Sequence, residues 1–190
     1  MGIRNKVHFK LSDIHNLSPL SELEVNAILR AADEVIGMGG RNIIAKILKG
    51  SHDKIVIEKE LNDCPSYGFY TIYSLDEIVQ RIDWMILKNY FKIEYNGKLP
   101  VITFSDKGWT TYKPVYVKEL FNLITNSNNS NYHDVILKFN KMNREVIEML
   151  LIKISEAKNH NLLDFLCEWE KTEVKKVRVM INSTIDQLKL

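Results

Sequence analysis

The sequence predicts a mainly helical α+β protein: a winged helix with a two-stranded β-hairpin wing, followed by a C-terminal helical extension. Three observations support this fold class. Apolar residues recur at helical spacing in the segments before residue 90. Two alternating segments then flank an Asn-Gly turn, which is typical of a hairpin. After residue 134 the helical spacing returns and continues to the end of the chain.

The first helix is expected to begin at Ser18 or Ser21, because either serine can cap a helix. The sequence GMGG at residues 37–40 ends it. Its apolar stripe is formed by Leu20, Leu23, Val25, Ile28, Leu29, Ala32 and Ile36. A second, shorter helix is expected over residues 41–49, and it ends at Gly50.

The stretch of residues 52–70 is less regular, and it predicts a short helix or an extended piece followed by a turn at Pro65 and Gly68. The clearest helix of the chain comes next. Ser74 is its expected N-cap, and Glu77 three residues later completes a capping box. Its buried stripe is formed by Leu75, Ile78, Val79, Ile82, Met85 and Ile86.

The wing is expected directly after this helix. Residues 91–95 (FKIEY) and 100–104 (PVITF) form its strands, and the sequence NGK between them forms the tip. Ser105 begins another short helical turn. Three helices followed by a two-stranded wing describe a winged helix.

The rest of the chain predicts helices. Residues 125–134 are rich in Ser and Asn and indicate an exposed loop or linker. Two further apolar stripes indicate a helical hairpin or bundle, packed on the first domain or on a second subunit. We therefore expect a winged-helix domain over residues 1–113 and a helical extension over residues 114–190.

Composition excludes several classes of protein. The chain has 190 residues and a net charge of +2, which by itself does not indicate a nucleic-acid binder. No apolar stretch approaches the roughly 20 residues of a membrane span, and we expect a cytoplasmic protein. The nucleotide fingerprints GxGxxG and GxxxxGKS/T are absent. Cys64 and Cys167 lack CxxC spacing and no nucleophile–base pair stands out, so we expect no metal, no cofactor and no catalytic residues.

The sequence KILKGSHDK, which ends the second helix, combines a glycine with several cations. Gly50 permits close backbone approach, and Ser51 offers a hydroxyl and a backbone N–H. Lys49 and Lys54 add charge, and Arg41 is expected nearby. Exposed N–H groups and cations are the components of an anion site. The alternative is a plain helix C-cap.

The capped helix is less suited to reading DNA. Its outward side is expected to carry Asp76, Glu77 and Asp83 against Arg81 and Lys88. Carboxylates directed at a polyanion disfavour deep insertion into a groove, and a solvated mixed-charge face is the plainer interpretation.

Two wing residues are candidates for DNA contact. Tyr95 can stack on a terminal base pair, and Lys98 can meet a phosphate. The alternative is that Tyr95 is a cross-strand partner of Val101 or Ile102, and that Lys98 keeps the tip soluble.

Several of these segments together resemble the RQC domain, the winged helix that follows the motor of RecQ-family DNA helicases. The resemblance covers roughly residues 20–113. Its most specific pieces are Leu48-Lys49-Gly50-Ser51, where the family typically has Leu-Arg-Gly-Ser, and Tyr67-Gly68. The capped helix, the hairpin and the sequence FSDKG follow in the family's order.

The resemblance implies a non-enzymatic protein that binds duplex ends, forks or other structured DNA through phosphates, in DNA repair or replication. It implies backbone contacts from the turn after Leu48 and from helix N-termini, which adds Ser74 to the candidates, and a wing that can separate strands. No P-loop lysine, DEAH-like box or cysteine quartet occurs in the sequence, so we expect a free-standing RQC domain. A separate helicase is then a candidate partner. The alternative function is a protein-interaction or dimerisation module, in which the winged helix has lost DNA binding and the C-terminal helices dock a partner or dimerise.

Overall fold

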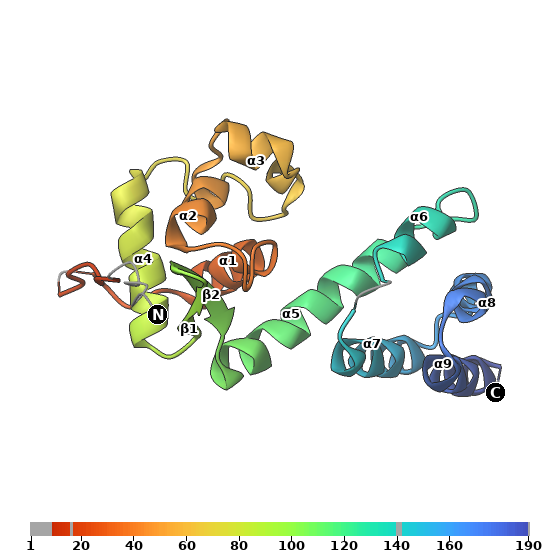
Figure 1. The fold of residues 1–190 in the computed structure, drawn as a ribbon. Coiled ribbons are helices and arrows are strands. Elements are labelled where there is room, and N and C mark those ends of the chain that lie inside the picture. The colour runs from red at the N-terminus through yellow and green to blue at the C-terminus, as the bar shows by residue number, and fades with distance from the viewer. Residues whose placement is uncertain (1–8, 16, 140–141, 190) are drawn as a thin grey trace, which may run out of the picture. The chain divides into compact units, whose positions relative to one another are not determined.

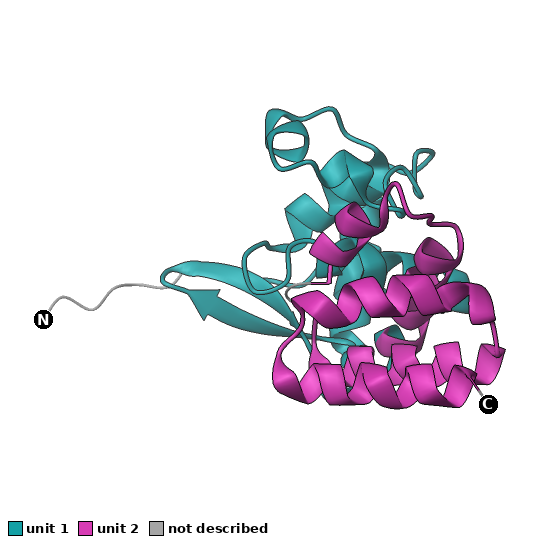
Figure 2. Cartoon of the chain, turned by 90° about the vertical axis from the view of Figure 1, so that its right-hand side faces the viewer, with its two compact units in different colours: residues 1–112 teal, residues 113–190 magenta. Residues whose placement is uncertain are grey.

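The computed structural model describes residues 9–15, 17–139 and 142–189 (Figure 1). The chain has two compact units, residues 1–112 and residues 113–190, which Figure 2 colours separately. Helix α5, Asp106–Thr125, runs through the predicted domain boundary at residue 113. The assignment of independent domains to either side of that boundary stays a prediction.

Three helices make the scaffold of the first unit. Helix α1, Glu22–Asp33, begins after Ser21, the second of the two predicted caps, and Glu24 completes a capping box there. Helix α2 spans Arg41–Lys49 and ends at Gly50 as predicted. Helix α4, Leu75–Leu87, has the predicted capping box of Ser74 and Glu77. Helices α2 and α4 are in contact, and both carry fully buried side chains: Ile44, Ile47, Leu48, Ile78, Ile82 and Met85.

Between α2 and α4 lies the segment for which the sequence left two alternatives open. It contains a short helix, α3, over Lys54–Glu58 and one 3₁₀ turn, η1, over Leu61–Asp63. Turns then lead to Ser74. The short-helix alternative is therefore the one that the structure has.

The wing consists of strands β1, Phe91–Asn96, and β2, Leu99–Phe104, paired antiparallel with Phe91 opposite Phe104. Gly97 has a φ of 64° in the turn, a conformation that glycine adopts without strain. The predicted hairpin and the α+β winged-helix fold class are confirmed.

The sequence FSDKG holds the base of the wing to the start of α5. The Ser105 hydroxyl donates to the Asn89 carbonyl and accepts the Gly108 N–H at 3.0 Å. The Gly108 backbone lies against the carbonyl of Tyr90, where an added Cβ would come within 2.0 Å of the oxygen. Serine and glycine at these positions therefore have a packing role.

Helix α5 is longer than the short turn expected from Ser105, since it has 20 residues and contains Pro114. Proline removes one helical N–H and leaves the Thr110 carbonyl without that partner. Both residues are exposed, so water can replace the lost bond and the helix continues.

The second unit is helical, as predicted for the extension. After α5 it contains α6 (Tyr132–Leu137), α7 (Arg144–Ala157), the 3₁₀ turn η2 (His160–Leu162), α8 (Leu163–Thr172) and α9 (Lys175–Leu188). The apolar spacing from Leu162 to Leu188 is continuous in the sequence and predicts a single helix there, which is wrong, since the structure divides this stretch between α8 and α9. The backbone is extended at Glu173, and the Glu173 carboxylate accepts the indole N–H of buried Trp169 at 2.9 Å. Among the described residues, no helix is long and apolar enough to cross a membrane.

Candidate nucleic-acid interface

The turn after Leu48 is closed on its own helix. Gly50 has a φ of 73°, and its N–H donates to the Ile47 carbonyl at 3.0 Å. The Ser51 N–H donates to the Lys46 carbonyl, also at 3.0 Å. Both amides satisfy carbonyls at the end of α2, as in other glycine-terminated helices. The expectation that Ser51 offers its backbone N–H to a phosphate is therefore wrong, while the C-cap alternative describes the backbone here.

Gly50 and Gly68 pack against each other. A Cβ on Gly50 would lie 3.1 Å from the Gly68 Cα. The Gly68 N–H donates to the Ile47 carbonyl at 3.0 Å, and the Tyr70 N–H donates to the Leu48 carbonyl at 2.7 Å. The two short motifs, Leu48–Ser51 and Tyr67–Gly68, thus pack against each other, since their glycines, 18 residues apart in the sequence, let the two backbones approach.

Lys49 connects the turn at Gly50 to the start of α4. Its ammonium donates to the carbonyls of Thr71 at 2.5 Å and Tyr73 at 2.7 Å, directly before Ser74. An ammonium has three donors. Within the described residues two are used, which leaves the third for an outside acceptor such as a phosphate oxygen. Lys49, Gly50, Ser51 and Ser74 therefore lie together.

Ser51 and Lys54 complete the polar side of the turn. The Ser51 Oγ accepts the Asp53 N–H at 3.2 Å, so within the described residues its own proton can be donated elsewhere. The Lys54 side chain is 84% exposed and its Nζ lies 3.4 Å from Glu58. Surface pairs of this kind are weak, and the Lys54 charge faces solvent.

Ser74 and Glu77 satisfy each other at the start of α4. The Ser74 N–H donates to the Glu77 carboxylate at 2.7 Å, and the Ser74 Oγ accepts the Glu77 N–H at 3.3 Å. The bonds from the Ser74 backbone and hydroxyl, with smaller effects from the charges of Arg81 and then Lys49, lower the pKa of Glu77. Glu77 is consequently anionic at neutral pH beside the Lys49 ammonium.

Arg41 does not lie near the turn, contrary to expectation. It stands at the opposite end of α2, about 12 Å away at 1.5 Å per residue. Its guanidinium bonds both oxygens of Asp83, at 2.7 and 2.5 Å. Asp83, expected on the outward side of α4, is fully buried. The exposed face of α4 thus has one carboxylate fewer than the sequence suggested.

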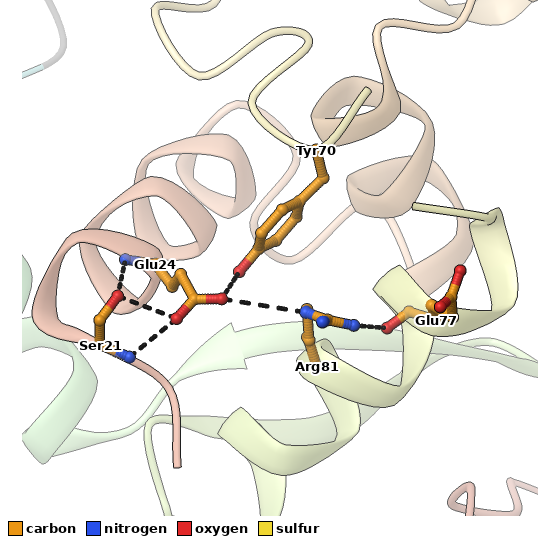
Figure 3. Close-up of polar contacts among 5 residues, drawn as sticks. All are labelled: Ser21, Glu24, Tyr70, Glu77 and Arg81. Carbon is orange, nitrogen blue, oxygen red and sulfur yellow. Dashed lines mark hydrogen bonds and ion pairs between the residues drawn. The ribbon is translucent and has the colours of Figure 1, made fainter. Parts of the chain in front are cut away.

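Arg81 was also assigned to the outward side, but its side chain is only 11% exposed. Figure 3 shows it between Glu24 of α1 and the Glu77 backbone. It donates to the Glu77 carbonyl at 2.9 Å, and its Nε, which has no hydrogen-bond partner among the described residues, lies 3.9 Å from Glu24. It also lies 3.8 Å from the centre of the Tyr73 ring. Arg81 thereby supports the segment whose carbonyls bind Lys49.

Glu24 carries the opposing charge of this cluster. Its carboxylate accepts the Tyr70 hydroxyl at 3.0 Å and the Ser21 N–H at 2.9 Å (Figure 3). Burial acts to raise the pKa of Glu24, but the bonds from Ser21 and Tyr70 and the charge of Arg81 outweigh it, so the pKa is lowered. Burial and the Glu24 carboxylate raise the pKa of Tyr70, which keeps its proton as a donor.

Sequence reasoning missed this cluster, because its members come from α1, α4 and the turns between α3 and α4. One signal was readable: Ser21 and Glu24 have the same spacing as Ser74 and Glu77.

The wing residues form a separate group. Tyr95 lies opposite Pro100, not opposite Val101 or Ile102 as the alternative supposed. Lys98 is exposed in the turn. Leu99, which sequence reasoning passed over, is 64% exposed next to it. Arg41 belongs to this side of the unit, since it lines one pocket together with Leu99 and Pro100.

Comparisons with known proteins agree with the fold. Residues 22–119 match the family model described as the RQC domain. The ATP-dependent DNA helicase RecQ of Bacillus subtilis (strain 168) is 25% identical over 99 residues, which are 52% of this chain and 16% of the helicase. The chain therefore matches a small part of that relative's length. No solved structure matches the chain.

Proposed function

The chain belongs to the RQC domain family, and on this basis we propose that it is a non-enzymatic DNA-binding protein. It binds duplex ends, forks or other structured DNA, mainly through backbone phosphates. The observation that carries the proposal is the family match over residues 22–119, which include everything from α1 to the wing.

The geometry at the end of α2 supports phosphate contacts by side chains. Counting partners in the described part of the chain, Lys49 has one ammonium donor left and Ser51 has its hydroxyl proton left, and Lys54 faces solvent. Such contacts position a protein on DNA without reading its sequence. The backbone of Gly50 contributes indirectly, since its close approach to Gly68 sets the position of Lys49.

The first turn of α4 supports binding at the backbone in preference to deep groove insertion. Asp76 and Glu77 are both exposed there, and the pKa of Glu77 is lowered, so its carboxylate carries a negative charge. Negative charge near a phosphate backbone is unfavourable. Binding therefore has little sequence preference, and Ser74 contributes from the edge of the helix.

The wing is the proposed contact for a duplex end or fork. Lys98 meets a phosphate, and Tyr95 with the exposed Leu99 faces the terminal base pair. The relative with the matching segment is named as a DNA helicase. We place this chain in DNA repair or replication in the cytoplasm, beside a separate helicase.

The test is fluorescence-anisotropy titration of a blunt duplex, a fork and a single strand at several salt concentrations. Lys54→Gln is the first variant, because Lys54 has only a weak surface pair to lose. It should weaken binding to every duplex sequence and lower the slope of log K against log salt by about 0.9. Lys138→Gln, an exposed lysine of the second unit, is the matched control. Equal and negligible binding to all three DNAs at low salt would contradict the proposal.

A second candidate function rests on the second unit. Exposed Ile152 of α7 and Val179 of α9 line a groove of about 510 Å³, with Leu151 and Met180 behind them. An apolar groove between two helices suits a docking helix, so the alternative is an interaction or homodimerisation module. Multi-angle light scattering of the wild type and of Ile152→Lys tests it. A monodisperse monomer that captures no partner argues against it.

A further inference from the structure

The turn directly before α4 presents an apolar side chain to solvent. Ile72 is 85% exposed, and among the described residues no other large apolar side chain is as exposed. Single apolar residues on a surface are common and by themselves indicate nothing. Ile72 differs from them in two respects: its backbone is held on both sides, and it lies beside candidate phosphate contacts.

The Lys49 ammonium holds the backbone on both sides of Ile72. It donates to the carbonyl of Thr71 at 2.5 Å and to the carbonyl of Tyr73 at 2.7 Å, and these are the residues directly before and after Ile72. Hydrogen bonds from a charged donor are stronger than neutral ones, so the two bonds fix the course of the chain here. We call residues 71–73 the Ile72 turn.

Further contacts tie the Ile72 turn to the helices behind it. The guanidinium carbon of Arg81 lies 3.8 Å from the centre of the Tyr73 ring, and the Tyr73 N–H donates to the Tyr70 carbonyl at 3.2 Å. The Tyr70 N–H in turn donates to the Leu48 carbonyl at 2.7 Å. The turn is thus fastened to both α2 and α4. A partner that covers Ile72 therefore meets a backbone that is already ordered, which lowers the entropic cost of binding.

The Ile72 turn lies among the candidate phosphate contacts. Within the described residues, the Lys49 ammonium that holds the turn keeps one donor for an outside acceptor. Ser74 directly follows the turn. A phosphate on the third donor of Lys49 would share its ammonium with the two carbonyls that flank Ile72. DNA bound by Lys49 therefore comes close to Ile72.

The carboxylates nearby favour an apolar contact with DNA at this place. Asp76 and Glu77 are exposed in the first turn of α4 and oppose the approach of further phosphates. The Ile72 side chain carries no charge and can lie against the sugar and base edges that flank a phosphate. Apolar side chains make such contacts with DNA, either against thymine methyl groups or between base steps.

We propose that Ile72 is an apolar DNA contact, which the Ile72 turn presents to the sugar and base edges next to the phosphate that Lys49 binds. This inference rests on the proposed DNA-binding function and extends it from phosphates to a contact that does not depend on charge. Lys49 then has two roles, since it binds the phosphate and holds the turn. Arg81 is a positioning residue, because it acts on the turn through Tyr73.

The test compares two single variants of the full chain, each of which removes one exposed apolar side chain. Ile72→Ala removes the proposed contact, and Leu87→Ala, at the opposite end of α4, is the matched control. The readout is fluorescence anisotropy of a blunt duplex at several salt concentrations. Ile72→Ala should weaken binding about tenfold at every salt concentration, because apolar burial is lost. The slope of log K against log salt should not change, since an apolar contact releases no counterions. Leu87→Ala should change neither quantity.

Three results overturn the inference while the proposed function survives. If Ile72→Ala binds like the wild type, Ile72 makes no DNA contact. If Ile72→Ala lowers the salt slope, the turn acts through phosphates alone, and if Leu87→Ala weakens binding equally, the effect is not specific to the turn. If the wild type binds no DNA at low salt, the proposed function fails as well.

A further variant tests the positioning by Arg81. Arg81→Lys keeps the charge but loses the planar group that lies over the Tyr73 ring. If Arg81 holds the turn, Ile72→Ala should cost about threefold or less in the Arg81→Lys background, against about tenfold in the wild type. Thermal melting checks that each variant is folded. Equal losses in both backgrounds would show that Arg81 does not position Ile72, since a merely structural role changes the melting temperature alone.

Discussion

The Cα of Gly68 lies 3.1 Å from the position that a Cβ on Gly50 would occupy. The backbones of these two glycines, 18 residues apart in the sequence, are thus in direct contact. Lys49 directly precedes Gly50, so this contact sets the position of the Lys49 side chain. Packing and the proposed DNA contacts therefore depend on the same turn.

Substituting Gly50 tests that contact. Gly50→Ala should cost the strain of a left-handed alanine, about 1–2 kcal/mol, plus the collision with Gly68. Gly37→Ala is the matched control, since Gly37 has a similar φ of +70° and no atom of the described residues lies within 4 Å of its Cβ position. Urea unfolding should give Gly50→Ala the larger loss, by about 1 kcal/mol or more. Equal losses would mean that the backbones can move apart at little cost.

Gly108→Ala should be among the most damaging single substitutions in the first unit. The new Cβ would lie 2.0 Å from the Tyr90 carbonyl oxygen, which is backbone and cannot rotate away. We expect a loss of roughly 3 kcal/mol in the free energy of unfolding, or failure to fold. Gly97→Ala at the wing tip, where the structure as described places no atom within 4 Å of the new Cβ, should cost only its left-handed strain. A Gly108→Ala loss no larger than that of Gly97→Ala would refute the packing role.

The Arg41–Asp83 pair should be costly to break on one side. Asp83→Ala leaves the guanidinium of Arg41, 21% exposed, without its carboxylate, and we expect a loss of about 3–5 kcal/mol in urea unfolding. Asp76→Ala removes an exposed carboxylate from the same helix and should change stability by about 0.5 kcal/mol or less. Combining Asp83→Leu with Arg41→Met should recover much of the loss, because the remaining charge is removed too. If the double variant is as unstable as Asp83→Ala, the loss comes from two other contacts: the Ser12 N–H bond to Asp83 and the Arg41 bond to the Lys10 carbonyl.

Glu24 should make stability depend on acid pH. Its pKa in the folded protein is lowered from 4.5, so at pH values near and below 4.5 the unfolded chain binds more protons than the folded one. The contribution of Glu24 is present above 4.5 and is lost as the pH falls through the lower, folded pKa. Unfolding free energies measured from pH 6 to pH 3 should fall less steeply for Glu24→Gln than for the wild type. Parallel curves would exclude Glu24 as a source of the acid sensitivity.

Local signals predicted the elements of the first unit well. The capping box at Ser74 and the Asn-Gly turn of the wing each depend on neighbouring residues alone, so their geometry follows from a few positions. The break at Glu173 escaped prediction because apolar spacing continues through it, while a bond to the indole of Trp169 accompanies the extended residue.

The candidate site divides in the same way. The sequence alone predicted the glycine that ends α2, the cations around it and the wing. It also predicted the family resemblance, which the match over residues 22–119 confirms. Only the tertiary structure decided where the charges point. Asp83 and Arg81 share the helical pattern of exposed residues, yet one is buried under Arg41 and the other lies against Tyr73. The reason is physical: charged side chains can be buried where partners from other elements satisfy them, and no local pattern records those partners.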